Sequence, residues 1–196
     1  MNRINFDKSR QEEFSRAQGR LLLHSCCAPC SSYCLQETAA VFSVTVFYYN
    51  PNIDSRGEYE KRKAEQIRFL TETGLGDFLD CDYLPEEFEA AASGLEDEPE
   101  GGKRCAKCFR LRLEKTARQA KEGGYDYFAT TLTLSPLKNA DLINQIGYSL
   151  EREYGVKYLP SDFKKRGGYL KSIELSKKHS LYRQNYCGCK YSKKSD

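Results

Sequence analysis

The chain has 196 residues, of which 39% are hydrophobic and 30% are charged, and its formal net charge is only +3. That length predicts one folded domain, and the sequence has no run of ~18 apolar residues that would span a membrane. The polar N-terminus also lacks the apolar stretch of a secretory signal. We therefore expect a single cytoplasmic domain over residues 1–196, with a polar leader at 1–19, an α/β core at 20–160 and a basic C-terminal segment at 161–196.

Apolar, β-branched runs alternate with amphipathic segments along the chain. Strands are predicted at residues 20–25, 42–50, 76–84, 125–133 and 156–160, and helices at residues 29–40, 55–74, 85–94, 103–124 and 139–155. Ser55 is expected to cap the second helix and Gly74 to end it. The remaining chain predicts a basic tail that is mostly helical or irregular.

Strands that alternate with helices predict an α/β fold with a mainly parallel sheet of about five strands and helices on both faces. In such sheets, functional sites form beyond the carboxyl ends of the strands. The segments that follow the predicted strands are rich in Cys, Pro and polar residues, namely HSCCAPC, YYNPNID, DYLPEE, TTLTLSPLK and LPSDFKK. The sequence therefore predicts a site at this edge of the sheet.

Cysteine is the residue type that carries most information about chemistry here. The count of nine is odd, which argues against complete disulfide pairing. In a reducing cytoplasm, clustered cysteines more often bind metal or perform redox chemistry. Three groups stand out, namely Cys26-Cys27-x-x-Cys30, Cys105-x-x-Cys108 and Cys187-Gly188-Cys189.

Cys105 and Cys108 stand at the start of a predicted helix, three residues apart, and so lie on one side of its first turn. The partial positive charge of a helix N-terminus stabilises thiolates. If the loop after the first strand faces this turn, Cys26 and Cys27 complete a set of four thiolates, which suits Zn²⁺ or an iron–sulfur cluster. A structural zinc site and a thioredoxin-like redox pair within CAPC stay open as alternatives.

Cys187 and Cys189 are separated only by Gly188. Two thiols at this spacing can close a small, strained and easily reduced disulfide, with glycine providing backbone freedom. The pair can therefore cycle between dithiol and disulfide or bind a second metal, and beside the other cysteines it suggests electron transfer. His24, at the exit of the first strand, is expected to be a satisfied core histidine rather than a catalytic group.

Together and in this order, these motifs resemble those of the QueH-type epoxyqueuosine reductases. The resemblance covers about residues 20–190 and is carried by HSCCAPC, YYNPNI, EGGKRCAKCFRLRL, TTLTLSPLKN, DFKK and LYRQNYCGC. It implies an oxidoreductase that reduces the epoxide of epoxyqueuosine to the alkene of queuosine in the anticodon loop of tRNA. The α/β layout is also similar to nucleotide-hydrolase-like (HUP-type) folds.

The resemblance also implies a cofactor. Four cysteines match the family's [4Fe-4S] ligands, namely Cys26, Cys27, Cys105 and Cys108. Two more match its redox-active pair, Cys187 and Cys189. An external electron donor is expected, since no flavin or nicotinamide fingerprint follows a predicted strand.

Cys30 matches the third thiol of the first motif. Its expected role is to help hold an additional mononuclear iron beside the cluster, with a carboxylate as co-ligand. Asp162 and Asp82 both follow predicted strands and are the candidates. Asp162 is preferred because fewer spare acids surround it.

The substrate that the resemblance implies is a nucleotide in an RNA loop. Residues 151–196 hold twelve Lys or Arg and five Asp or Glu, which suits contacts with phosphates. The side chains expected to contact tRNA are Lys164, Lys165, Arg166, Tyr169 and Arg183. Two other interpretations stay open: a zinc-stapled RNA-binding module without catalysis, and a thiol–disulfide oxidoreductase.

Overall fold

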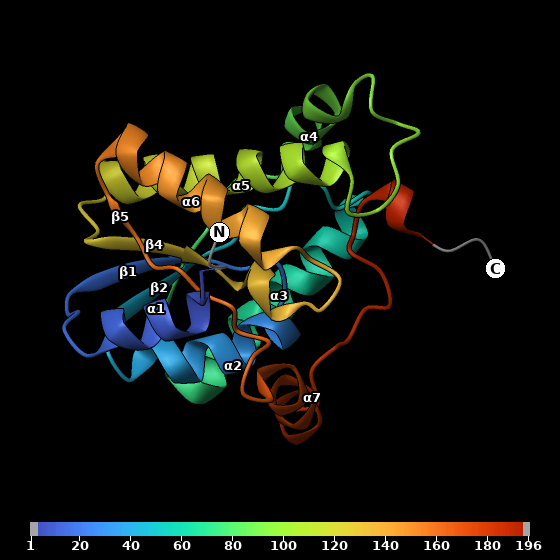
Figure 1. Cartoon of the computed structure of the whole chain (residues 1–196). Coiled ribbons are helices and arrows are strands. Elements are labelled where there is room, and N and C mark those ends of the chain that lie inside the picture. The colour runs from blue at the N-terminus through green and yellow to red at the C-terminus, as the bar shows by residue number, and fades with distance from the viewer. Residues whose placement is uncertain (1–3, 194–196) are drawn as a thin grey trace.

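The structure is a computed structural model that describes residues 4–193. Its strands alternate with helices along the chain, as expected (Figure 1). The strands are β1 (Arg20–His24), β2 (Ser43–Phe47), β3 (Asp77–Leu79), β4 (Tyr127–Thr130) and β5 (Lys157–Tyr158). The helices are α1 (Phe6–Phe14), α2 (Ala28–Ala39), α3 (Arg56–Thr73), α4 (Pro85–Ala92), α5 (Lys103–Glu122), α6 (Ala140–Tyr154) and α7 (Gly168–Lys178), with short 3₁₀ helices η1 (Thr131–Leu134) and η2 (Lys190–Ser192).

The five strands form one sheet in the order β3-β2-β1-β4-β5, and every neighbouring pair is parallel. Strands β1, β2 and β3 form one half of the sheet, and β4 and β5 form the other half. The carboxyl ends of β1 and β4 therefore flank the point where the strand order reverses, which is where α/β sheets form their ligand sites. His24 pairs with Thr130 in this register, so the loops after the two strands start side by side.

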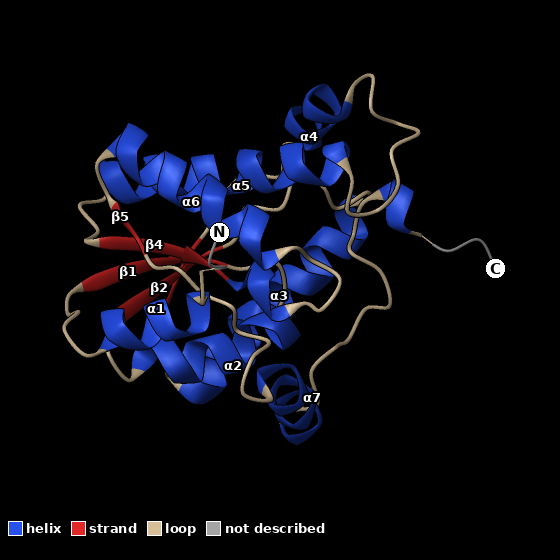
Figure 2. Ribbon diagram, in the orientation of Figure 1, coloured by secondary structure: helices blue, strands red, loops and turns tan. Residues whose placement is uncertain are grey.

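Helices cover both faces of the sheet (Figure 2), which confirms the predicted fold class. Side chains alternate along β1: Leu21 and Leu23 pack in one apolar core with residues of α2 and α3, and Leu22 packs in another with residues of α5 and α6. The strand reads as a continuous apolar run because both of its faces are buried, as in most parallel sheets.

Several predicted boundaries are confirmed and others shift. Ser55 caps α3 by accepting a hydrogen bond from the Glu58 amide, and Gly74 ends the helix with a left-handed backbone at φ 63°. The strand predicted at 76–84 ends at Leu79, and β5 has only two residues. Within residues 4–193, no helix is both long and apolar enough to cross a membrane.

Helix α1 lies inside the predicted polar leader and is not among the predicted elements. The Asn5 side chain accepts a hydrogen bond from the Lys8 amide and so starts the helix. Phe6 and Arg10 are buried, and Phe14 packs against the apolar core beside Phe42. These three side chains recur every four residues, so one face of a mostly charged helix covers the sheet.

Candidate metal and redox site

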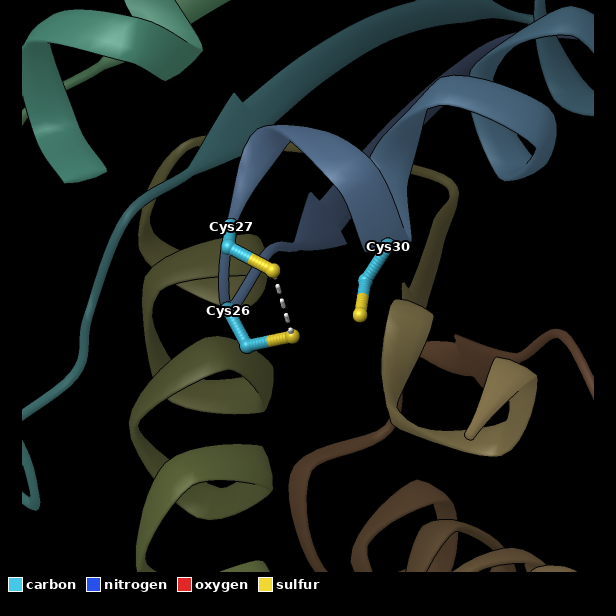
Figure 3. Close-up of side chains that lie close together, drawn as sticks. All are labelled: Cys26, Cys27 and Cys30. Atoms are coloured by element: carbon cyan, nitrogen blue, oxygen red, sulfur yellow. Dashed lines mark hydrogen bonds between the residues drawn. The ribbon is translucent and has the colours of Figure 1, made fainter. Parts of the chain in front are cut away.

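The first cysteine motif turns the chain from β1 into α2 and brings three sulfur atoms together (Figure 3). Cys27 precedes the helix with extended backbone, and Cys30 lies in its first turn. The Sγ atoms of Cys26, Cys27 and Cys30 all lie within 4.8 Å of one another. Adjacent cysteines can converge here because the backbone bends between strand and helix.

This spacing is that of a metal-binding group. The Sγ atoms of Cys26 and Cys27 are 3.8 Å apart. Around one tetrahedral ion with metal–sulfur bonds of about 2.3 Å, two sulfurs are also ~3.8 Å apart. In the described part of the chain, no other set of three Cys, His, Asp or Glu ligand atoms converges within the same distance.

The three thiols differ in acidity because they hydrogen-bond to one another. Hydrogen bonds from Cys27 and then Cys30 hold the pKa of Cys26 well below its usual value. The same contact with Cys26 raises the pKa of Cys27 to about 12, and Cys30 is also raised well above its usual pKa. Contact between the three thiols therefore favours a thiolate at Cys26.

The second motif lies in the first two turns of α5. The Gly101 amide donates a hydrogen bond to Cys105 Sγ at 3.2 Å, and Cys105 packs against the same apolar core as Cys26. Cys108 is buried in a small cluster with Cys189. Burial raises the pKa of the Cys105 thiol, and nearby Cys187 and Cys189 raise it further. The second and third motifs are therefore neighbours, although Cys105 and Cys108 lie outside the three-sulfur set.

The third motif forms a tight turn that α3 and the loop before it hold in place. Gly188 has φ 122°, and a Cβ there would crowd Asn52, Ile53 and Arg62. The Asp54 amide donates to the Gly188 carbonyl at 2.9 Å, and Arg62 donates to the Cys187 carbonyl at 3.2 Å. Both cysteines are free thiols, and Cys189 is 8% exposed.

A cavity of about 450 Å³ opens beside the sulfur atoms and is the right size for a small-molecule site. Its walls come from the loops after β1 and β4, from α7 and from the segment that crosses from α7 toward η2 (Figure 1). Predicted site residues that line it are Cys26, Cys30, Tyr169, Arg183 and Cys187. The cavity therefore joins the first and third cysteine motifs to part of the predicted RNA surface.

Arg112 lines this cavity and is only 1% exposed. Its Nε donates to His24 Nε2 at 3.2 Å, and its Nη2 donates to Asn50 Oδ1 at 2.6 Å. Burial and then the Arg112 charge lower the pKa of His24 to about 3. His24 is therefore neutral; its Nδ1 lies 2.9 Å from Thr130 Oγ1, and its Nε2 lies 3.1 Å from the Tyr49 carbonyl oxygen. It is a satisfied core histidine, as expected, and it orients Arg112.

The predicted co-ligands and the predicted RNA contacts of residues 162–166 lie outside the cavity lining. The Asp162 carboxylate pairs with Lys164 at 2.7 Å, and Asp82 is exposed. Arg166 pairs with Asp7 at 2.8 Å, and Lys165 is exposed. Neither aspartate belongs to the three-sulfur set.

A sequence model of the family described as "Epoxyqueuosine reductase QueH" matches residues 21–195, nearly the whole chain. The chain belongs to the QueH family. The Streptococcus pyogenes serotype M1 protein of that name is 44% identical over 202 residues, which cover 98% of this chain and 79% of that protein. The Staphylococcus epidermidis QueH is 43% identical, and the match covers 97% of this chain and 85% of that protein. The Thermotoga maritima QueH is 40% identical, and the match covers 89% of this chain and 90% of that protein.

These QueH proteins are named as reductases, which confirms the predicted family and the enzyme class of oxidoreductase. A zinc-stapled module without catalysis is not favoured.

Three further side chains at the QueH site carry no role in the sequence-based predictions. Arg112, described above, is one of them. Gln184 donates to Cys27 Sγ at 2.9 Å, and Lys138 lines the cavity. Burial lowers the pKa of Lys138, but Cys187, Cys26 and Cys30 raise it above its ordinary value. All three lie within segments that carry the family resemblance, and only tertiary contacts bring them to the sulfurs.

Proposed function

We propose that this chain reduces epoxyqueuosine to queuosine in the anticodon loop of cytoplasmic tRNA. One observation carries the proposal: in a member of the QueH family, cysteines from separate motifs lie beside one cavity at the carboxyl edge of the sheet. Converting an epoxide to an alkene consumes two electrons and two protons, and the oxygen leaves as water. Free thiols and cationic side chains at one cavity suit that chemistry.

We assign Cys26, Cys27, Cys105 and Cys108 as the ligands of a [4Fe-4S] cluster, because all four are thiols, the ligand type that iron–sulfur clusters take. Cys26 and Cys27 would have to move apart from their 3.8 Å contact so that each binds its own iron. N–H groups of Gly101 and Gln184 donate to Cys105 and Cys27, as donors around such clusters do. A bound cluster would supply single electrons received from an external donor.

Cys30 is assigned to an additional mononuclear iron. It belongs to the three-sulfur set and lines the cavity where substrate would bind. A carboxylate from Asp162 is the preferred co-ligand, with Asp82 as the other candidate. Asp162 would have to exchange its ion pair with Lys164 for the metal.

Cys187 and Cys189 are assigned as the redox-active pair. Closing a disulfide between two thiols releases two electrons and two protons, which is the amount that one epoxide consumes. Cys187 lines the cavity, and Gly188 gives the turn the backbone freedom that ring closure needs. The external donor would then return the pair to the dithiol.

Contacts with tRNA are assigned to the rim of the cavity and to the basic residues beside it. Tyr169 lines the cavity and offers a ring on which an unpaired base can stack. Arg183 lines the same wall, and Lys165 is exposed for a phosphate. Lys164 and Arg166 would reach phosphates only by leaving their carboxylate partners.

The test is to incubate anaerobically purified protein with a reductant and tRNA that carries epoxyqueuosine, and then to quantify the nucleosides by mass spectrometry. We expect queuosine to appear in the amount that epoxyqueuosine is lost. Cys187→Ser should keep the visible spectrum of the wild type and lose turnover, while Cys34→Ala should keep both. Binding of tRNA with no change in its nucleosides would contradict the proposed function.

A further inference from the structure

We propose that Arg112 is a fixed counter-charge of the thiolate centre and makes that centre easier to reduce. The inference rests on the proposed function, because it assumes that the cysteines hold an iron–sulfur cluster. Arg112 would act through the cysteines around it, which makes it a positioning residue for charge rather than a catalytic residue.

The placement of Arg112 follows from α5. Cys105, Cys108 and Arg112 recur at intervals of three and four residues, so one face of the helix presents all three side chains. The guanidinium is held by two neutral acceptors, His24 and Asn50. Within residues 4–193, its third nitrogen, Nη1, has no hydrogen-bond partner although it is buried.

Arg112 differs from the other buried arginines in what surrounds its guanidinium. Arg104 also lacks a carboxylate partner, but its Nη1 donates to the carbonyls of Leu95, Glu96 and Glu98. Arg10 is buried beside the Asp7 carboxylate at 2.9 Å, and Arg62 is buried beside the Glu58 carboxylate at 2.6 Å. For Arg112, no ion pair with a carboxylate occurs among the described residues. A buried charge without a counter-charge is costly, and no carbonyl accepts from Arg112 Nη1 among the described residues, so we infer a negative partner of another kind.

The cysteines supply that partner. Arg112 lies one turn after Cys108 on α5, on the helix face that also carries Cys105. It also lines the cavity together with Cys26, Cys30 and Cys187. Arg112 therefore lies beside ligands assigned from the first and second motifs.

A fixed positive charge stabilises whichever form of the centre carries more negative charge. Reduction adds one negative charge, so Arg112 should favour the reduced form. His24 is neutral and Asn50 has no charge, so neither partner cancels the field of the guanidinium. His24 and Asn50 orient the guanidinium but do not neutralise it, so its full positive charge acts on the cysteines.

The experiment is a redox titration of the anaerobically purified holoenzyme, followed by its visible absorption. Arg112→Gln removes the charge, Arg112→Lys keeps it, and Arg10→Gln is the matched control because Arg10 is buried beside carboxylates elsewhere. We expect Arg112→Gln to lower the ratio of reduced to oxidised cluster about tenfold at a fixed potential, which is ~59 mV for one electron. Arg112→Lys and Arg10→Gln should stay close to the wild type.

A second variant covers the case in which Arg112→Gln fails to fold. Asn50→Asp keeps the shape of the side chain and places a carboxylate against Arg112, so it should cancel the charge and lower the midpoint in the same direction. A full cluster with an unchanged midpoint in either variant overturns this inference and leaves the proposed function standing. Wild-type protein without iron and sulfide overturns the proposed function, and the inference with it.

Discussion

Cys30 and Cys34 lie one turn apart on α2, and their surroundings give them different chemistry. Cys34 is fully buried in the apolar core between α2 and the sheet, and burial raises its pKa well above the usual value. Cys30 lines the cavity and lies within 4.8 Å of two other sulfurs. A buried apolar thiol is inert, whereas a clustered thiol beside a cavity can bind metal.

This contrast predicts different outcomes for two substitutions. Cys30→Ser should lower the iron bound per chain, because serine is a poor replacement for the assigned ligand. Cys34→Ala should keep the iron content and cost about 1 kcal/mol of unfolding free energy, because it leaves a small cavity in the core. Iron analysis and urea denaturation of both variants check this. Equal iron loss in both, or in neither, would contradict the assignment of Cys30.

At the scale of elements, α3 holds the segment 179–193 that carries the third cysteine motif. The Tyr182 amide donates to the Glu65 carboxylate at 2.7 Å, and the Tyr186 hydroxyl donates to Asp54 at 3.1 Å. These contacts replace regular secondary structure, which the segment lacks between α7 and η2. Its position therefore depends on a few carboxylates.

The Glu65 contact predicts a pH dependence. Hydrogen bonds from Arg68, and then from the Tyr182 amide, hold the pKa of Glu65 below its ordinary value of 4.5. A carboxyl whose pKa is lowered on folding stabilises the protein above that value, and this stability is lost as the pH falls through its folded pKa.

Glu65→Gln should therefore be less stable than the wild type at neutral pH, and the difference should shrink as the pH falls below 4.5. Glu60→Gln is the control, because Glu60 is also on α3 but its ion pair with Arg56 is exposed. Urea denaturation across this pH range measures both differences. A Glu65→Gln difference that grows toward acid pH would refute the role given to this contact.

At the scale of the whole molecule, periodicity predicts the α/β class and the five strands, because parallel sheets with both faces buried leave apolar runs such as Leu21–Leu23. The strand order is not predicted, since it depends on which side each crossover takes. The predicted strand at 125–133 ends at Thr130, because the Thr130 hydroxyl accepts from the Leu132 amide and starts η1. β-branched composition alone does not reveal that turn.

Only part of the candidate site, like only part of the fold, is predicted from the sequence. The cysteine motifs are visible in the sequence because their spacing is local. Arg112 and Gln184 are not, because their contacts with His24 and Cys27 join residues far apart in the chain. Helix α1 is also hidden, since its apolar face is only Phe6 and Phe14 among charged residues.

We propose above that the converging cysteines hold an iron–sulfur cluster for epoxide reduction. The most direct measurement is the visible spectrum of anaerobically purified protein, with iron, sulfide and zinc quantified per chain. We expect broad absorption near ~400 nm with about four irons and four sulfides per chain, and further iron if Cys30 holds a second ion. Zinc alone, with neither sulfide nor visible absorption, would contradict it.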